Sequence, residues 1–193
     1  MTTAQLYQEL NYVNHSREKR LHYANLVIDN PDLIEKLLEI LFMVDDKISP
    51  RAAWVFEFMC KENLEEAIPY LDYFTENMHK VHQDSAVRPV AKVCEYLVNA
   101  YYSRSENRMK TELLPRHREK IIEVCFDYMI NEEKIAPKAY SMKCLYLLGK
   151  DYDWIHPELV LILERDFQMQ SSGFKARAKQ IIKKVKGKSL PKI

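Results

Sequence analysis

The sequence predicts an all-α protein, an α-α superhelix (solenoid) of about five antiparallel helical pairs. A stretch at 48–56 places a basic residue and then small and bulky apolar residues at a helix start. Weaker echoes follow, so that the basic positions Arg51, Arg88, Lys138 and Lys175 lie 37, 50 and 37 residues apart. A repeat of this length between helical segments is typical of stacked helical pairs. No segment alternates with the period of a strand, so we expect no sheet.

The first four helices are predicted over 4–14, 15–28, 31–44 and from residue 49 onward. Leucine and isoleucine recur at helical spacing in the third helix, which gives it one buried face. Asn30 before Pro31 and Ser49 before Pro50 are cap-plus-proline pairs, typical of helix starts. We expect both polar residues to cap the helices that follow.

The second half continues the pattern with six more helices. We expect one helix over 64–81, bent at Pro69, and another that begins at Asp84 or Ser85. The polar stretch 103–108 is the longest expected loop and accounts for the one long interval. The remaining helices are expected over 115–132, 137–148, 156–167 and 173–186, with Gly149 ending the second of these four.

A chain of 193 residues is suited to one domain, which we place at 1–186. Its first pair, about 4–29, is atypical, as a capping repeat should be. Its last helix, about 173–186, is basic and is followed by a short basic tail, 187–193. Residues 172–193 hold eight basic and no acidic residues, so the rest of the chain carries a net charge of −7.

Composition excludes several classes of protein. The three glycines cannot form a phosphate-binding GxGxxG or GxxxxGK[ST] loop. The chain starts without the pattern of a signal peptide, and we expect no transmembrane segment because no apolar run approaches about 18 residues. The four cysteines form no CxxC pair and lie in apolar helical patterns, which favours buried thiols in a reducing cytoplasm.

The chain resembles HEAT-like (ARM-type) helical repeats, and three sets of residues support this. They are a proline near the first helix of a pair (Pro31, Pro69, Pro115, Pro157), an acid ahead of the second helix (Asp45, Asp46, Asp84, Glu132, Glu133), and the basic residue early in that second helix (Arg51, Arg88, Lys138, Lys175). The resemblance implies that acidic and basic positions pair between neighbouring repeats as a structural ladder.

One enzymatic branch of such proteins is the alkylpurine DNA glycosylases, which use aromatic residues and an aspartate on a concave, basic face. Here Trp54 is followed four residues later by Phe58 instead of a carboxylate. Trp154 has Glu158 at that spacing, but a proline lies between them, so we expect them to straddle a helix start. The glycosylase resemblance is therefore distant and lacks the catalytic pattern.

No local constellation indicates catalysis. His79 and His82 lie near Asp84, but no third ligand follows at a fixed spacing for zinc, and an exposed pair without a metal is favoured. Cys94 and Cys144 occupy equivalent repeat positions, which points to packing. We therefore expect no catalytic, metal-binding or cofactor-binding residue and lean against an enzyme.

Two functions stay open at this point. The first is a scaffold that binds a protein partner on its concave face; the second is nucleic-acid binding or base repair through the basic last helix. That helix is also explained as a solvated cap. The residues expected on a binding surface are Arg51, Trp54, Arg88, Lys138, Lys175, Lys179 and Lys183. The sequence leaves the oligomeric state open.

Overall fold

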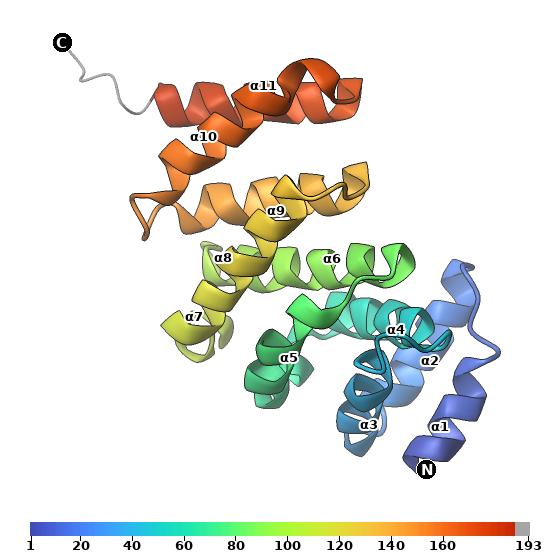
Figure 1. The fold of residues 1–193 in the computed structure, drawn as a ribbon. Helices are drawn as coiled ribbons and strands as arrows, with labels where there is room; N and C mark the ends of the chain where they lie inside the picture. The colour runs from blue at the N-terminus through green and yellow to red at the C-terminus, as the bar shows by residue number, and fades with distance from the viewer. Residues whose placement is uncertain (188–193) are drawn as a thin grey trace.

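The computed structural model describes residues 1–187, which form α-helices and short 3-10 helices, with no strand among these residues (Figure 1). The first helix of each successive pair is α1 (Thr3–Leu10), α3 (Asp32–Leu41), α5 (Leu71–Asn77), α8 (Pro115–Ile130) and α10 (Ile155–Asp166). The second is α2 (Arg17–Ile28), α4 (Ser49–Glu62), α6 (Asp84–Tyr101), α9 (Ile135–Leu148) and α11 (Ser172–Lys186). The predicted all-α solenoid of helical pairs is confirmed.

The helices form two layers that follow the order of the chain (Figure 1). In the second layer, α2, α4, α6, α9 and α11 each contact the next helix in this series. In the first layer, α1 contacts α3 and α5 contacts α8, but α3 and α5 make few or no contacts with each other, and the same holds for α8 and α10. Because the second layer is packed more closely, the stack curves toward it. The outward side of the second layer is thus the inner side of the curve.

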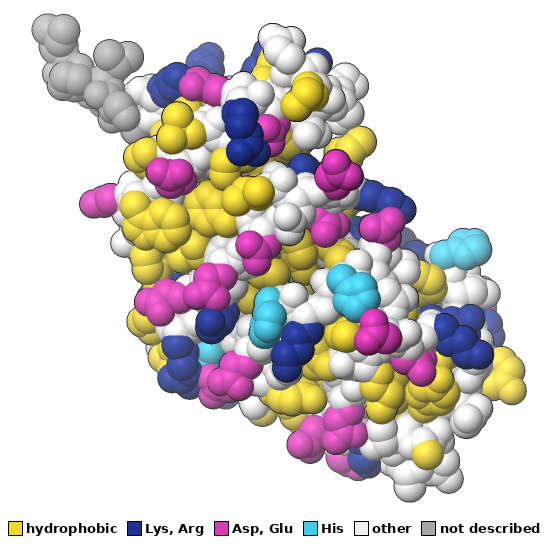
Figure 2. Space-filling model, in the orientation of Figure 1, with side chains coloured by type: hydrophobic (Ala, Val, Ile, Leu, Met, Phe, Trp, Pro, Cys, Tyr) yellow, Lys and Arg dark blue, Asp and Glu magenta, His cyan; other side chains and the backbone are white. Residues whose placement is uncertain are grey.

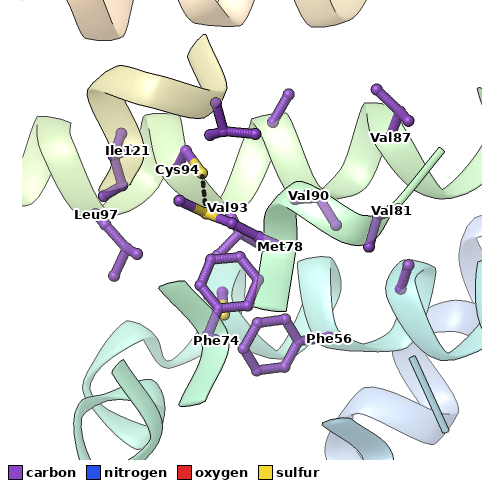
Figure 3. Packing of buried hydrophobic residues seen from close by; sticks show 14 of the residues in the cluster. Phe56, Phe74, Met78, Val81, Val87, Val90, Val93, Cys94, Leu97 and Ile121 are labelled. Atoms are coloured by element: carbon purple, nitrogen blue, oxygen red, sulfur yellow. Dashed lines mark hydrogen bonds between the residues drawn. The ribbon is translucent and has the colours of Figure 1, made fainter. Parts of the chain in front are cut away.

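A continuous apolar core lies between the layers and extends from Leu6 in α1 to Ile181 in α11. Near the middle, the rings of Phe56 and Phe74 lie 5.3 Å apart (Figure 3). The thiol of Cys94 points at the sulfur of Met78 at 3.6 Å, beside these rings. The helical spacing of apolar residues therefore directs one face of each helix into a shared core.

The predicted bent helix over 64–81 is wrong. The chain instead forms a 3-10 helix (Leu64–Tyr70), then α5, then a second 3-10 turn (Met78–Lys80). Pro69 lies inside the first of these segments. Proline has no N–H to donate and clashes with the preceding turn of an α-helix, so an α-helix begins only after it.

A short extra helix, α7 (Met109–Glu112), follows the predicted loop, so the expected total of ten helices is wrong. The two expected caps are also wrong. Helix α3 has Pro31 in the cap position, and the amide of Asn30 donates to the carbonyl of Leu26 in the preceding helix. Ser49 lies inside α4, and its hydroxyl donates to the carbonyl of Leu41 at 2.5 Å. Both side chains satisfy the carbonyl end of an earlier helix instead.

Gly149 follows α9 as predicted, but with φ −64° it does not use the left-handed conformation that favours glycine at helix ends. The last helix is described to Lys186, and the predicted tail beyond Gly187 lies outside the described residues. No helix within residues 1–187 is long and apolar enough to cross a membrane.

Candidate binding surface on the second layer

The outward side of the second layer is lined by basic and aromatic side chains. In α6 they are Arg88, Lys92 and Tyr96, which follow each other at intervals of four residues. Residues at this spacing lie on one face of a helix. None of the three is fully buried, whereas the intervening Val90 and Val93 belong to the core. The same helix therefore supports the core with one face and presents charge with the other.

A pocket of about 440 Å³ opens at the start of this surface, where α2, α4, α6 and α9 meet. Its lining is Arg20, Trp54, Asp84, Ser85 and Arg88, together with His15, Lys134, Ala136 and Pro137. The indole of Trp54 donates to the carbonyl of Ser85 at 2.8 Å, which fixes the ring against the start of α6.

Arg88 is held in this pocket by the buried carboxylate of Glu57 in α4, to which it donates two hydrogen bonds of 3.1 and 2.6 Å. Burial alone would lower the pKa of Arg88, but its hydrogen bonds and charge interaction with Glu57 raise it above the usual value. The guanidinium of Arg20 lies 4.6 Å above the ring of Phe58. Both arginines are thus oriented by α4.

The middle of the surface is organised around a second buried carboxylate, Glu95. It accepts from Lys92 at 2.6 Å and from Lys143 of α9 at 3.2 Å. The ammonium of Lys92 also lies 5.0 Å from the ring centroid of Tyr96 and 4.4 Å from that of Tyr140. Burial, with a further contribution from Glu57 and Glu95, raises the pKa of Tyr96 to about 12. Glu95 therefore pairs with two lysines, whose combined positive charge exceeds its single negative charge.

A second pocket, of about 400 Å³, lies between α9 and α11. Its polar lining is Lys143, Arg177, Gln180 and Lys184, with Tyr146, Leu147 and Ile181 completing it. Arg177 donates to the carbonyl of Ala139 at 2.9 Å, and Lys184 lies 5.6 Å from the ring centroid of Tyr146. No carboxylate lines this pocket among the described residues.

These pockets and the residues between them make up what we call the cationic band. It contains seven cations, namely Arg20, Arg88, Lys92, Lys134, Lys143, Arg177 and Lys184. The carboxylates that contact or line it are Glu57, Asp84 and Glu95. The excess of positive charge favours an anionic ligand. The band is cationic although residues 1–171 carry a net charge of −7.

The structure separates the seven residues expected on a binding surface. Trp54 and Arg88 line the first pocket. Arg51 donates to the carbonyls of Leu10 and Asn11 at the end of α1, at 3.3 and 2.5 Å. Lys138 is only 6% exposed and donates to the carbonyl of Met129 in the last turn of α8. Arg51 and Lys138 thus join helices and do not line the band.

The three lysines expected on α11 lie on the other side of that helix from the band. At about 100° per residue, Lys175, Lys179 and Lys183 fall on one stripe, whereas Arg177 and Lys184 fall roughly opposite. Lys175 and Lys179 lie 5.9 and 5.6 Å from the ring centroid of Phe167, which follows α10. The basic helix therefore presents two separate cationic faces.

The acid–base ladder implied by the resemblance does not form with the expected partners among the described residues. Asp45 pairs with His82 at 3.2 Å, and Asp84 pairs with Lys134 at 2.9 Å. Of the four aligned cations, Arg88 forms an ion pair, and its partner Glu57 was not among the expected acids. The other three cations bind backbone carbonyls instead: Arg51 reaches the neighbouring pair, whereas Lys138 and Lys175 bind within their own pair.

The cations of the middle and end of the band were not among the residues expected from the sequence; they are Lys92, Lys143, Arg177 and Lys184. A signal was present, because basic and aromatic residues recur every three to four positions along α6 and α9. All four cysteines are free and buried, and burial raises the pKa of Cys60, Cys94 and Cys144 above the usual range. These three thiols stay protonated and are not activated nucleophiles.

Two layers of helical pairs, joined end to end by a continuous core, define an α-α repeat protein. The profile of the HEAT repeat domain matches residues 7–185, and the chain belongs to this family. No curated protein matches the chain significantly. No solved structure matches it either.

Proposed function

We propose that this protein is a non-enzymatic HEAT-repeat scaffold that binds an acidic segment of a protein partner along the cationic band. The observation that supports this is the continuity of the band. It extends over α4, α6, α9 and α11, which are neighbours in the second layer, with a pocket near each end. Repeat proteins bind extended partners along such surfaces. Complementary charge steers these partners to the surface and aligns them on it.

The chemistry of the pockets fits peptide side chains. The first combines the indole of Trp54 with the guanidinium groups of Arg20 and Arg88. The second combines Tyr146 and Leu147 with three cations. Each pocket thus offers an apolar wall beside a charge, which suits a partner that alternates carboxylates with bulky apolar residues.

The test is fluorescence anisotropy with a labelled synthetic peptide of alternating Glu and Leu residues. Arg177→Gln combined with Lys184→Gln removes two charges from the band, and binding should weaken by on the order of 10-fold. The matched control, Lys179→Gln combined with Lys183→Gln, removes the same charge from the opposite face of the same helix. Equal effects of the two double variants would contradict the proposal, since only non-specific attraction depends on charge alone.

Nucleic-acid binding is the second candidate, and one observation favours it. Trp54 and Asp84 line the same pocket as Arg20 and Arg88, so an aromatic ring, an aspartate and cations lie together. No carboxylate follows Trp54 at a spacing of four residues, but Asp84 of the neighbouring helix α6 lies in the same pocket. Labelled duplex and single-stranded oligonucleotides belong in the same titration. Tight binding that falls by orders of magnitude between about 50 and 200 mM salt would replace the peptide proposal and justify a base-excision assay.

We further propose that residues 1–186 fold as one domain, which the continuous core from α1 to α11 supports. Chemical denaturation should then show one transition that coincides by tryptophan fluorescence and by circular dichroism.

The cytoplasmic location also remains a proposal. It is supported by four free, buried cysteines, and cell fractionation tests it.

A further inference from the structure

The first layer carries a patch of large apolar side chains where the residue before α10, Trp154, lies against α8. The ring of Trp154 stacks on that of Phe126, with centroids 5.5 Å apart and an interplanar angle of 20°. Trp154 is 53% exposed, and Ile130 in α8 and Leu161 in α10 are 55% and 60% exposed. Figure 2 shows hydrophobic side chains gathered around the connection from α9 to α10 and the adjacent part of α8.

The positions of these residues show that the patch is not an accident of a loop. Phe126 and Ile130 are four residues apart on α8, and Trp154 and Leu161 are seven residues apart at the start and middle of α10. Each spacing places both residues on one helix face. That face points away from the core, where solvated polar residues are the rule, so grouped exposed apolar residues indicate a contact with another molecule.

Carboxylates accompany the apolar residues of the patch. Glu119 and Glu123 on α8 line its pocket, and Asp127 on α8 and Asp153 and Glu158 at the start of α10 lie within four residues of Phe126 or Trp154 in the sequence. Glu123 pairs with Lys120 at 2.8 Å, whereas the other four form no ion pair among the described residues. Figure 2 shows acidic side chains along the edge of the hydrophobic area. The patch is therefore acidic at its rim and apolar at its centre.

The centre is also hollowed. A pocket of about 360 Å³ is lined by Ile122, Phe126, Tyr152 and Trp154, with Glu119 and Glu123 at its polar side. Its volume admits one large apolar side chain, and the carboxylates lie where the neighbouring side chains of a bound helix would fall. An aromatic anchor within a charged rim is the arrangement typical of a protein-binding hot spot.

We propose that this aromatic patch docks a basic amphipathic helix of a protein partner, which inserts a Leu- or Phe-sized side chain beside Trp154. Lysines or arginines of that helix would face Glu119 and Glu158, which form no ion pair within residues 1–187. The patch lies on the first layer and the cationic band on the second, and the two require partners of opposite charge. The protein can therefore hold two different partners at once, as an adaptor.

The test uses a labelled amphipathic peptide of Leu and Lys, with a matched peptide of Leu and Glu as the control probe. Anisotropy is measured for the full chain and for Trp154→Ala, which should weaken binding of the Leu/Lys peptide by at least about 10-fold. Glu119→Gln combined with Glu158→Gln should weaken it by several fold and reduce its salt dependence. Glu18→Gln combined with Asp29→Asn removes the same charge at the other end of the solenoid and should leave binding unchanged.

Three results would overturn the proposal. The first is that the Leu/Lys peptide binds Trp154→Ala and the full chain equally, or binds neither of them. The second is that the Glu18/Asp29 control variant weakens binding as much as the Glu119/Glu158 variant, in which case attraction to an acidic surface explains binding. The third result is concentration-dependent self-association, measured by light scattering, that Trp154→Ala abolishes, because this would assign the patch to a second copy of the chain. Circular dichroism melting establishes that each variant is folded.

Discussion

Arg88 on α6 and Glu57 on α4 join two neighbouring repeats through two parallel hydrogen bonds. The Glu57 side chain is 8% exposed, and that of Arg88 is 32% exposed. A carboxylate this buried is costly to leave without its partner. The pair therefore fixes the relative position of two helices in the same place where it orients the guanidinium toward the first pocket.

The first prediction is a double-mutant cycle on this pair. Arg88→Ala should lower the free energy of unfolding by about 2–3 kcal/mol, because it leaves the Glu57 carboxylate buried and uncompensated. Urea denaturation of both single variants and of the double variant should give a coupling energy of at least about 1 kcal/mol. The control is the exposed pair Lys61 and Glu62, for which we expect about 0.5 kcal/mol or less. A coupling no larger than that of the control would contradict the prediction.

The second prediction concerns pH. Hydrogen bonds from Arg116 and then from His117 hold the pKa of Asp72 well below its usual range. A carboxyl with a depressed pKa in the folded state stabilises the protein above its unfolded pKa of about 4, and this stability is lost as the pH falls toward the folded pKa. Asp72→Asn should therefore be less stable than the wild type at pH 7, with a difference that shrinks below about pH 4.

The measurement is the free energy of unfolding of the wild type and of Asp72→Asn between pH 7 and pH 2.5. Asp29→Asn serves as the control, because the Asp29 side chain is exposed and forms no ion pair in the described part of the chain. A wild-type advantage over Asp72→Asn that stays constant, or grows, as the solution is acidified would show that the carboxylate does not act in this way.

The sequence predicted those parts of the fold that depend on local order. Apolar residues at helical spacing were sufficient for the helices and for their pairing, since each helix needs a partner for its apolar face. The α-helix expected over 64–81 does not form as one helix. Pro69 disrupts an α-helix, and this outweighs the helical pattern on both sides of it. The two predicted N-caps were wrong because Asn30 and Ser49 donate to carbonyls of the preceding helix. The prediction rested only on the residues that follow them.

The binding surface was harder to predict, because its parts are far apart in the chain. Trp54 and Asp84 are 30 positions apart and meet only when α4 and α6 stack. Arg51, Arg88 and Lys138 all lie early in the second helix of a pair, but a similar place in the sequence does not decide exposure. The Lys138 side chain lies against the end of α8 and is buried there. Its burial depends on how closely α8 and α9 pack.

The third prediction tests the packing around Gly149. A Cβ at this position would overlap the ring of His156, which stacks on Tyr146 and lies 2.9 Å from the Tyr146 carbonyl through Nε2. The backbone conformation itself is open to any residue, so the cost of Gly149→Ala comes from this overlap alone. We expect a loss of about 1–3 kcal/mol. Adding His156→Ala should recover part of it, and strict additivity of the two changes would contradict this explanation.

The fourth prediction has the opposite sign. Gly173 lies in the first turn of α11, and no atom lies within 4 Å of the place where a Cβ would be built. Glycine there costs conformational entropy on folding without relieving any contact, so Gly173→Ala should stabilise the protein by about 0.5–1 kcal/mol. For a chain of this size the melting temperature should rise by roughly 1–4 °C, measured by circular dichroism. A decrease would mean that the start of α11 needs the freedom of glycine, and the helix-terminus geometry around Ser171, whose hydroxyl accepts from the Phe174 N–H, would be the first place to examine.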